Sequence, residues 1–294
     1  MSQDDSPGIQ RLRTRVQAHL DVIYGAKCPR SLPSDVIAAM QYPDEVSEPA
    51  PYQNDWDESD CWMITYATTV RDERSSGLTS LQSFCDQHLA GAINGLHILP
   101  FYPYSSDDGF AVIDYYDVNE DAGTWDDIRS LAGRYRLMAD LVINHVSSQS
   151  EWFQNYISRK DPGKDYFKEA PPEEDLSMVV RPRSTPLRTE VETVDGNRWV
   201  WCTFGPDQVD LDFANPEVLL EFVKIVRHYI DNGVRVLRLD AVAFLWKEVG
   251  TSCLHDQRTH EIIKLFRTLI EFLDPSIMLI TETNVPNRDN LTYF

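Results

Sequence analysis

The sequence predicts an α/β fold built around a parallel sheet. Short, continuous apolar runs recur along the chain, and runs of this kind suit strands that are buried on both faces. Helical patterns lie between the runs, as right-handed crossovers between parallel strands require. The chain has 294 residues, of which 42% are hydrophobic and 25% charged. It can therefore bury a sizeable core, in one large domain or two smaller ones.

The first 60 residues are predicted to be a helical extension followed by an acidic linker. Apolar side chains in residues 8–24 recur at steps of three and four, which indicates an amphipathic helix, and residues 33–40 suit a second short one. Residues 41–60 contain three prolines and seven acidic residues but no basic one, a composition typical of a loop. We therefore expect a domain boundary near residue 60.

Strands and helices are predicted to alternate from residue 61 onward. The predicted strands are Cys61–Tyr66, Leu96–Pro100, Leu137–Ile143, Val234–Leu239 and Ile277–Ile280. The predicted helices lie near residues 78–89, 124–134, 216–231 and 256–273. The third of these has the clearest ends, with Asn215 as N-cap, Pro216 in the first position and Gly233 beyond the last turn.

Residues 146–214 interrupt this alternation between the third and fourth strands. They are too many for a simple strand-to-helix loop and contain short β-like pieces such as Trp199–Phe204. A long insertion after a strand is typical of a functional segment or a small subdomain.

Charge and cysteine content exclude several classes of function. The chain has 27 basic and 47 acidic residues, a net charge of −20. Such a surface repels phosphate backbones and anionic lipid, so neither nucleic acid nor a membrane is an expected partner. The five cysteines are widely spaced without a CxxC pair, which indicates reduced thiols in a cytoplasmic protein. No apolar run approaches the ~18 residues of a membrane span, and no secretory signal is recognisable.

Charged side chains stand at the carboxyl ends of the last two predicted strands, where parallel α/β folds gather their chemistry. Arg238 and Asp240 are two residues apart and so point to one face of a strand. A guanidinium beside a carboxylate lowers its pKa, which predicts Asp240 to be ionised. Glu282 follows the next strand and is less compensated, so it could serve as an acid. Two carboxyl groups with separated pKa values are typical of glycoside chemistry.

Each of these residues also has a structural explanation. The pair of Arg238 and Asp240 is equally typical of a buried ion pair, and Glu282 of a residue that caps a loop. His145, which follows the third predicted strand, is also consistent with a hydrogen-bonded core histidine. Because acids at strand ends bind metals in unrelated barrels, these residues alone do not separate a glycosidase from a metal-dependent lyase.

Taken together and in order, the segments resemble the α-amylase superfamily, glycoside hydrolase family 13. Three segments resemble its first three signature regions, namely Asp140–His145, Gly233–Ala241 and Leu279–Glu282. Gln208–Asp212 is similar to its additional motif near the end of the insertion, and Gly109–Tyr115 to the loop after its second strand. The resemblance runs from about residue 61 to residue 294. It implies a (β/α)8 TIM-barrel type of fold, with about the first five β/α units present in residues 61–294.

A finer similarity is to sucrose phosphorylases and the related glucosylglycerate or glucosylglycerol phosphorylases. The supporting stretches are Leu96–Pro103, Val180–Arg183, Phe204–Asp212 and Asp240–Cys253. This resemblance implies retaining α-glucosyl transfer from a small carbohydrate, with inorganic phosphate as co-substrate and glucose 1-phosphate as product. No cofactor is implied. No metal is expected either, because the insertion lacks a dense set of Asp and Asn at ligand spacing.

The resemblance also implies roles for individual side chains. Asp240 is expected to be the nucleophile, Glu282 the acid and base, and Arg238 the residue that orients Asp240. The expected substrate-binding residues are Asp107 and His145 for sugar hydroxyls, Phe110 and Phe204 beside the ring, Gln208 near the acceptor, and Arg181 and Arg183 for phosphate. A solvated pair on a loop is the equal alternative for the two arginines.

One departure from the family pattern leaves alternatives open. The fourth signature, a His-Asp pair after the seventh strand, is absent from a sequence that stops just past the fifth predicted strand. The chain is therefore expected to be part of a longer protein or a half-barrel with altered function. A hydrolase or transglycosylase of the same family, or a catalytically silent fragment, remain alternatives, and the oligomeric state is left undetermined.

Overall fold

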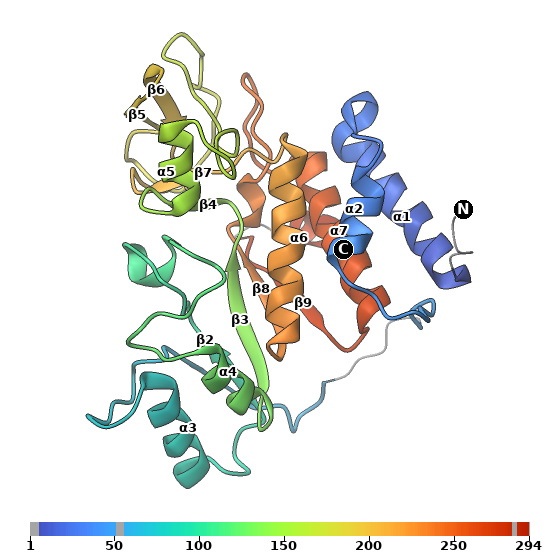
Figure 1. The fold of residues 1–294 in the computed structure, drawn as a ribbon, viewed down its shortest axis with the longest axis vertical. Helices are drawn as coiled ribbons and strands as arrows, with labels where there is room; N and C mark the ends of the chain where they lie inside the picture. Colours follow the sequence, from blue (N-terminus) through green and yellow to red (C-terminus); the bar gives the residue numbers. More distant parts are fainter. Residues whose placement is uncertain (1–5, 51–55, 284–286, 294) are drawn as a thin grey trace.

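The computed structural model describes residues 6–50, 56–283 and 287–293. Its centre is a five-stranded sheet in the order β1-β2-β3-β8-β9, in which every neighbouring pair is parallel (Figure 1). The strands are β1 (Trp62–Thr65), β2 (Gly95–Ile98), β3 (Arg136–Val142), β8 (Val234–Asp240) and β9 (Met278–Thr281). The predicted α/β fold with a parallel sheet is confirmed, and each predicted strand overlaps an observed one.

Helices connect the strands as expected for βα units. The connecting helices are α3 (Gly77–His88), α4 (Trp125–Ala132), α6 (Pro216–Asp231) and α7 (Gln257–Leu273). The predicted start of α6 is confirmed, because the Asn215 side chain accepts a hydrogen bond from the backbone N–H of Glu217. Its cap and its apolar stripe thus fix α6 against the sheet. A short α8 (Asn287–Asn290) and a 3-10 turn (Leu291–Tyr293) follow β9.

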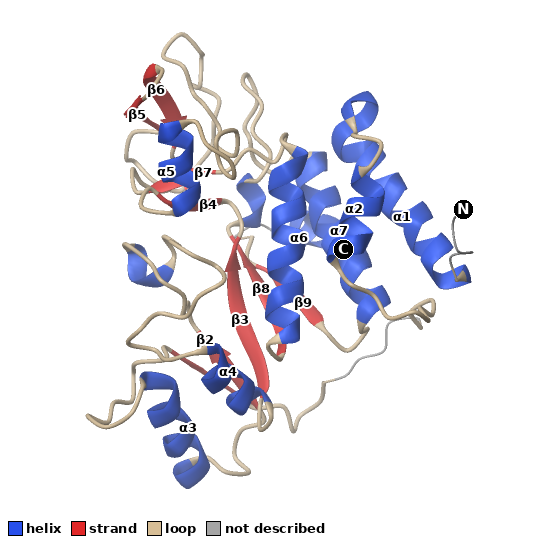
Figure 2. Cartoon of the chain, viewed as in Figure 1, coloured by secondary structure: helices blue, strands red, loops and turns tan. Residues whose placement is uncertain are grey.

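Two N-terminal helices pack outside this layer. Figure 2 shows α1 (Pro7–Tyr24) and α2 (Leu32–Ala39) beyond α6 and α7, and α1 lies against α7 while α2 lies against α6. The apolar stripe of α1 is buried except at Ile9, which is partly buried, and it belongs to the same hydrophobic cluster as the sheet. The predicted helix over residues 8–24 is confirmed. A boundary near residue 60 stays a prediction, and residues 1–5 and 51–55 of the extension and linker lie outside the described residues.

The insertion after β3 is a small layer of its own, above the carboxyl ends of the strands (Figure 1). It holds α5 (Glu151–Ser158) and an antiparallel hairpin of β5 (Arg188–Thr193) and β6 (Gly196–Trp201). At its base, β4 (His145–Ser147) pairs antiparallel with β7 (Gln208–Asp210). This pairing brings the two ends of the insertion together over the sheet, next to β3.

No described helix is both long enough and apolar enough to cross a membrane.

Candidate active site

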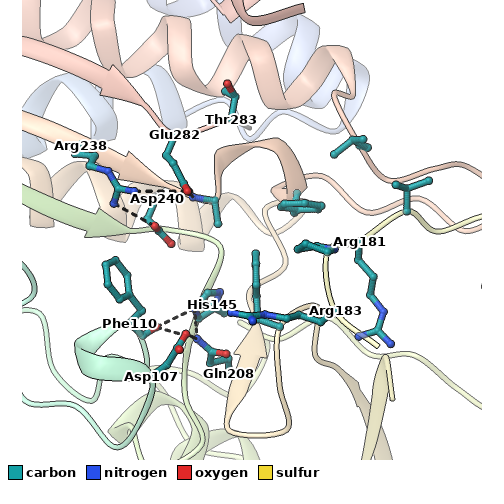
Figure 3. A pocket seen from close by; sticks show the side chains of 16 residues that line it. Asp107, Phe110, His145, Arg181, Arg183, Gln208, Arg238, Asp240, Glu282 and Thr283 are labelled. Carbon is teal, nitrogen blue, oxygen red and sulfur yellow. Dashed lines mark hydrogen bonds and ion pairs between the residues drawn. The ribbon is translucent and has the colours of Figure 1, made fainter. Parts of the chain in front are cut away.

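A cavity of about 580 Å³ opens at the carboxyl ends of the strands, beneath the insertion. All ten side chains predicted to act on substrate line this one cavity (Figure 3). They come from the loop after β2, from β4, from the insertion, and from the ends of β8 and β9. Residues as far apart in sequence as Asp107 and Glu282 therefore meet because parallel strands end at the same edge of a sheet.

The two predicted catalytic carboxyl groups share one arginine. Arg238 Nη1 lies 3.3 Å from Asp240 Oδ1, and Arg238 Nη2 lies 3.6 Å from Glu282 Oε1. The backbone N–H of Ala241 donates to Glu282 Oε2 at 3.1 Å. Ala241 has a φ of 53°, a left-handed conformation that costs a non-glycine residue energy and is typical of functional sites. The turn after β8 thus aims a donor at Glu282 from beside Asp240.

Burial dominates the protonation of Asp240. Burial and, after it, the neighbouring Glu282 raise the pKa of this carboxyl group to about 7, against the opposing effect of Arg238. The prediction that the guanidinium would bring the pKa of Asp240 below its usual range is therefore wrong. The neighbouring Glu282 thus makes ionisation of Asp240 less favourable.

Two further buried residues hold Arg238 in place. Its Nη1 donates to Asp140 Oδ1, and the other oxygen of Asp140 lies 2.7 Å from His97 Nε2. Asp140 on β3 stands opposite Arg238 on β8 in the strand register. Sequence reasoning assigned no role to His97, whose one signal is a histidine inside the otherwise apolar strand β2.

The opposite wall of the cavity carries the residues expected to bind sugar. Gln208 Nε2 donates to Asp107 Oδ2 at 2.9 Å and lies 3.2 Å from His145 Nε2. That same His145 nitrogen lies 2.9 Å from the backbone oxygen of Phe110. Burial lowers the pKa of His145, which favours a neutral ring at neutral pH. The ring of Phe204 lies 5.1 Å from that of His145, so aromatic and polar groups alternate along this wall.

The two predicted phosphate-binding arginines lie on a loop of the insertion. The backbone N–H of Val180 donates to Ser252 O at 3.0 Å, which ties this loop to the one after β8. Arg181 donates to the backbone oxygen of Thr203 at 3.2 Å, and burial lowers its pKa. Among the described residues, neither Arg181 nor Arg183 forms an ion pair with a carboxylate. Both positive charges are therefore available to an anion in the cavity.

A buried ammonium occupies the base of the insertion. Lys247 Nζ lies 3.0 Å from Asp210 Oδ2 and 3.0 Å from Asn144 Oδ1, and the side chains of Lys247 and Asp210 are almost completely buried. No cluster of three or more His, Cys, Asp or Glu side chains able to hold a metal ion occurs in the described part of the chain. Sequence reasoning missed Lys247, although a lysine within the apolar stretch after Asp240 was a visible signal.

The chain is similar to known proteins both in sequence and in structure. The profile of "Alpha amylase, catalytic domain" matches residues 90–294. The chain is 43% identical to a glucosylglycerate phosphorylase of Allomeiothermus silvanus over 96% of its own length and 50% of that protein. It is 34% identical to a sucrose phosphorylase of Streptococcus mutans, over 65% of this chain and 41% of that one.

The structure is similar to a crystal structure of sucrose 6F-phosphate phosphorylase from Thermoanaerobacter thermosaccharolyticum. The TM-score is 0.69 at 27% identity, covering 77% of this chain and 48% of that one. The chain thus spans about half the length of the first curated relatives it matches.

Proposed function

The chain belongs to the α-amylase family, and we propose that its cavity binds the glucosyl group in a retaining phosphorylase acting on a small α-glucoside. The parallel sheet and the insertion after β3 are part of a TIM-barrel type of fold, and the described residues supply five of its parallel strands. The observation that carries the proposal is a pair of carboxyl groups bridged by Arg238, in one cavity with two arginines that lack an acidic partner among the described residues. Relatives named glucosylglycerate phosphorylase and sucrose phosphorylase support it.

In the first step, the carboxylate of Asp240 attacks the anomeric carbon while the bond to the leaving oxygen breaks. Glu282 gives its proton to that oxygen, and a glucosyl ester forms on Asp240. In the second step, a phosphate oxygen attacks the same carbon, Glu282 takes up the phosphate proton, and Asp240 leaves as glucose 1-phosphate forms. Two inversions give net retention. Arg238 contacts both carboxyl groups, and its positive charge favours the ionised form of Asp240, which is the form that attacks.

Arg181 and Arg183 are proposed to bind the phosphate. Guanidinium groups match phosphate oxygens in pairs, and this protein needs such a local concentration of positive charge because its net charge of −20 repels anions. The leaving group and the phosphate would then use the same side of the cavity in turn. Hydrolysis or transglycosylation by the same two carboxyl groups is the alternative within the family.

The dependence of turnover on phosphate tests the proposal. The complete protein should release glucose 1-phosphate from glucosylglycerate or sucrose only when inorganic phosphate is present. Arg181→Gln and Arg183→Gln should each raise the KM for phosphate by about tenfold while the KM for the glucosyl donor changes little, since a charge-assisted hydrogen bond contributes roughly 1.5–3 kcal/mol. Release of free glucose at the same rate without phosphate would instead establish a hydrolase. If the complete protein transfers no glucosyl group at all, the proposal fails and the alternative of a catalytically silent protein is favoured.

Trapping of the glucosyl ester tests the two catalytic assignments. Asp240→Asn should abolish turnover with the fold retained, because an amide of the same shape cannot attack. Glu282→Gln should accept a glucosyl group from a donor with an activated leaving group and then stall. Mass spectrometry of a peptic digest should find the added hexose on the peptide that contains Asp240. Activity retained in Asp240→Asn, or a hexose on another residue, would overturn the assignment.

A further inference from the structure

One carboxylate behind the cavity wall joins three separate segments of the chain. Asp207 Oδ2 accepts hydrogen bonds from the hydroxyl groups of Ser105 and Ser106, both at 2.5 Å. Its Oδ1 accepts from Ser148 at 2.6 Å and from Ser147 at 3.4 Å. The loop after β2, the segment at β4 and the end of the insertion therefore meet at Asp207. We refer to these four serines as the serine cluster.

Each of the three joined segments carries a residue proposed to bind the sugar. Asp107 follows the first serine pair directly, His145 lies two residues before the second pair, and Gln208 follows Asp207 itself. The three side chains meet at Gln208 Nε2, which is 2.9 Å from Asp107 and 3.2 Å from His145. The spacing of these groups is therefore set by how firmly Asp207 holds the three backbones together.

The backbone next to the serine cluster requires such support. Asp107 and Asp108 both have positive φ values, 55° and 51°, and Gly109 follows with 107°. Left-handed conformations at two consecutive non-glycine residues cost energy and persist only where the surroundings determine them. A glycine is required at 109, because a Cβ there would lie 2.5 Å from Pro100 Cβ. The strained turn thus depends on contacts from outside the loop.

Asp207 is well suited to this task as a carboxylate. Burial alone would raise its pKa, but the hydrogen bonds from Ser105, Ser106 and Ser148 outweigh burial and lower the pKa below its usual range. Ionised Asp207 can accept from all four hydroxyl groups, whereas an amide offers only one oxygen as acceptor. Asn in this position would present an NH2 group on one side, so the hydroxyl protons on that side would lose the carboxylate oxygen as their acceptor.

We propose that Asp207 is a positioning residue for glucosyl binding: through the serine cluster it fixes Asp107, His145 and Gln208 at the spacing that one sugar ring requires. This inference rests on the proposed function, because the ring is the glucosyl group of that reaction. Asp207 itself lies behind the residues that line the cavity. Its effect therefore reaches the substrate only through its neighbours.

The test compares Asp207→Asn with Asp127→Asn in the complete protein. Asp127 on α4 is a matched control, since it too accepts from hydroxyl groups of two segments, at Thr79 and Thr124, but none of these residues lines the cavity. Asp207→Asn should lower kcat/KM for the glucosyl donor by about 10- to 100-fold, since small displacements of positioning groups cost that much. The KM for phosphate should stay within about twofold, because Arg181 and Arg183 lie on another loop. The control should change neither constant.

Amide hydrogen exchange gives a second measurement that does not depend on activity. Backbone hydrogen bonds such as Ile113 N to Pro103 O and Ser105 N to Ala111 O close the loop after β2. Exchange in residues 105–113 should be accelerated at least tenfold in Asp207→Asn and in Ser105→Ala, and unchanged in α6 and α7.

The two measurements separate failure of the positioning role from failure of the proposed function. Unchanged donor kinetics in an active Asp207→Asn protein, with or without faster exchange, would overturn the positioning role. If the complete unaltered protein transfers no glucosyl group, the proposed function fails. In that event an unchanged exchange rate overturns the positioning role as well, while faster exchange confined to residues 105–113 supports it.

Discussion

Burial of Asp240 gives the site a defined response to pH. Its carboxyl group must be ionised to attack, and burial raises the pKa to about 7. We therefore expect the low-pH limb of kcat/KM to rise with a midpoint near pH 7, as Asp240 becomes ionised. Arg238→Gln should move this limb to higher pH, because the guanidinium opposes the rise in pKa. A limb near pH 4, as for an exposed Asp, would contradict this reading.

The buried ion pair of Lys247 with Asp210 should contribute strongly to the stability of the protein. Removing it in Lys247→Met leaves Asp210 buried without its charged partner, and breaking a buried pair costs about 3–5 kcal/mol. Urea unfolding should show this loss. Lys224→Met is the matched control, since its pair with Glu221 leaves the lysine half exposed, and it should cost less than about 1 kcal/mol.

Because the Lys247 ammonium already neutralises Asp210, we expect that no metal ion is required at this position. A chelator should change neither the unfolding temperature nor the activity of the unaltered protein. A loss that calcium restores would contradict this prediction.

How far sequence could predict the site differs from residue to residue. The positions of Arg238, Asp240 and Glu282 were predictable, because the carboxyl ends of parallel strands meet at one edge of the sheet and these residues stand at such ends. The raised pKa of Asp240 was not, since it sums the burial contributed by many distant side chains. The partnership of Asp207 with its serines was equally hidden, because the hydrogen bonds span 59 to 102 residues of sequence.

At the scale of elements, α1 behaves as part of the core. Val16 on α1 is completely buried, whereas Val22 on the same helix is 42% exposed. Val16→Asp should destabilise the protein by several kcal/mol, because it buries an unpaired charge. Val22→Asp should change stability by less than about 0.5 kcal/mol. Equal effects in urea unfolding would mean that α1 does not depend on its packing against α7.

Element predictions succeeded where a local signal decided the structure. The start of α6 followed from Asn215 and Pro216, and β8 from a continuous apolar run. The pairing of β4 with β7 had no such signal, because strands of three residues are fixed by their partners and not by their own sequence. These two short strands nevertheless deliver His145 and Gln208 to the cavity.

For the whole molecule, the described sheet has β1 at one edge and β9 at the other. Ile64 on β1 is 65% exposed, and unpaired strand edges with apolar side chains promote association. We expect a polypeptide of residues 1–294 alone to self-associate and to show no glucosyl transfer. Sedimentation velocity and a phosphorolysis assay test this. A monomer that forms glucose 1-phosphate would show that these residues are sufficient for the reaction.

Because α1 packs on a helix near the other end of the sequence, it is synthesised well before its packing partner α7. His19 on α1 bonds to Glu261 on α7, 242 residues later in the chain. At typical rates of translation, α1 emerges roughly 12–50 s before the helix that covers it. Throughout that interval the face of α1 that packs on α7 can contact solvent, the ribosome surface, a chaperone or earlier parts of the chain such as α2. The docking of α1 on α7 therefore cannot precede the synthesis of α7, whereas β1, β2, β3 and β8 are all made before that helix.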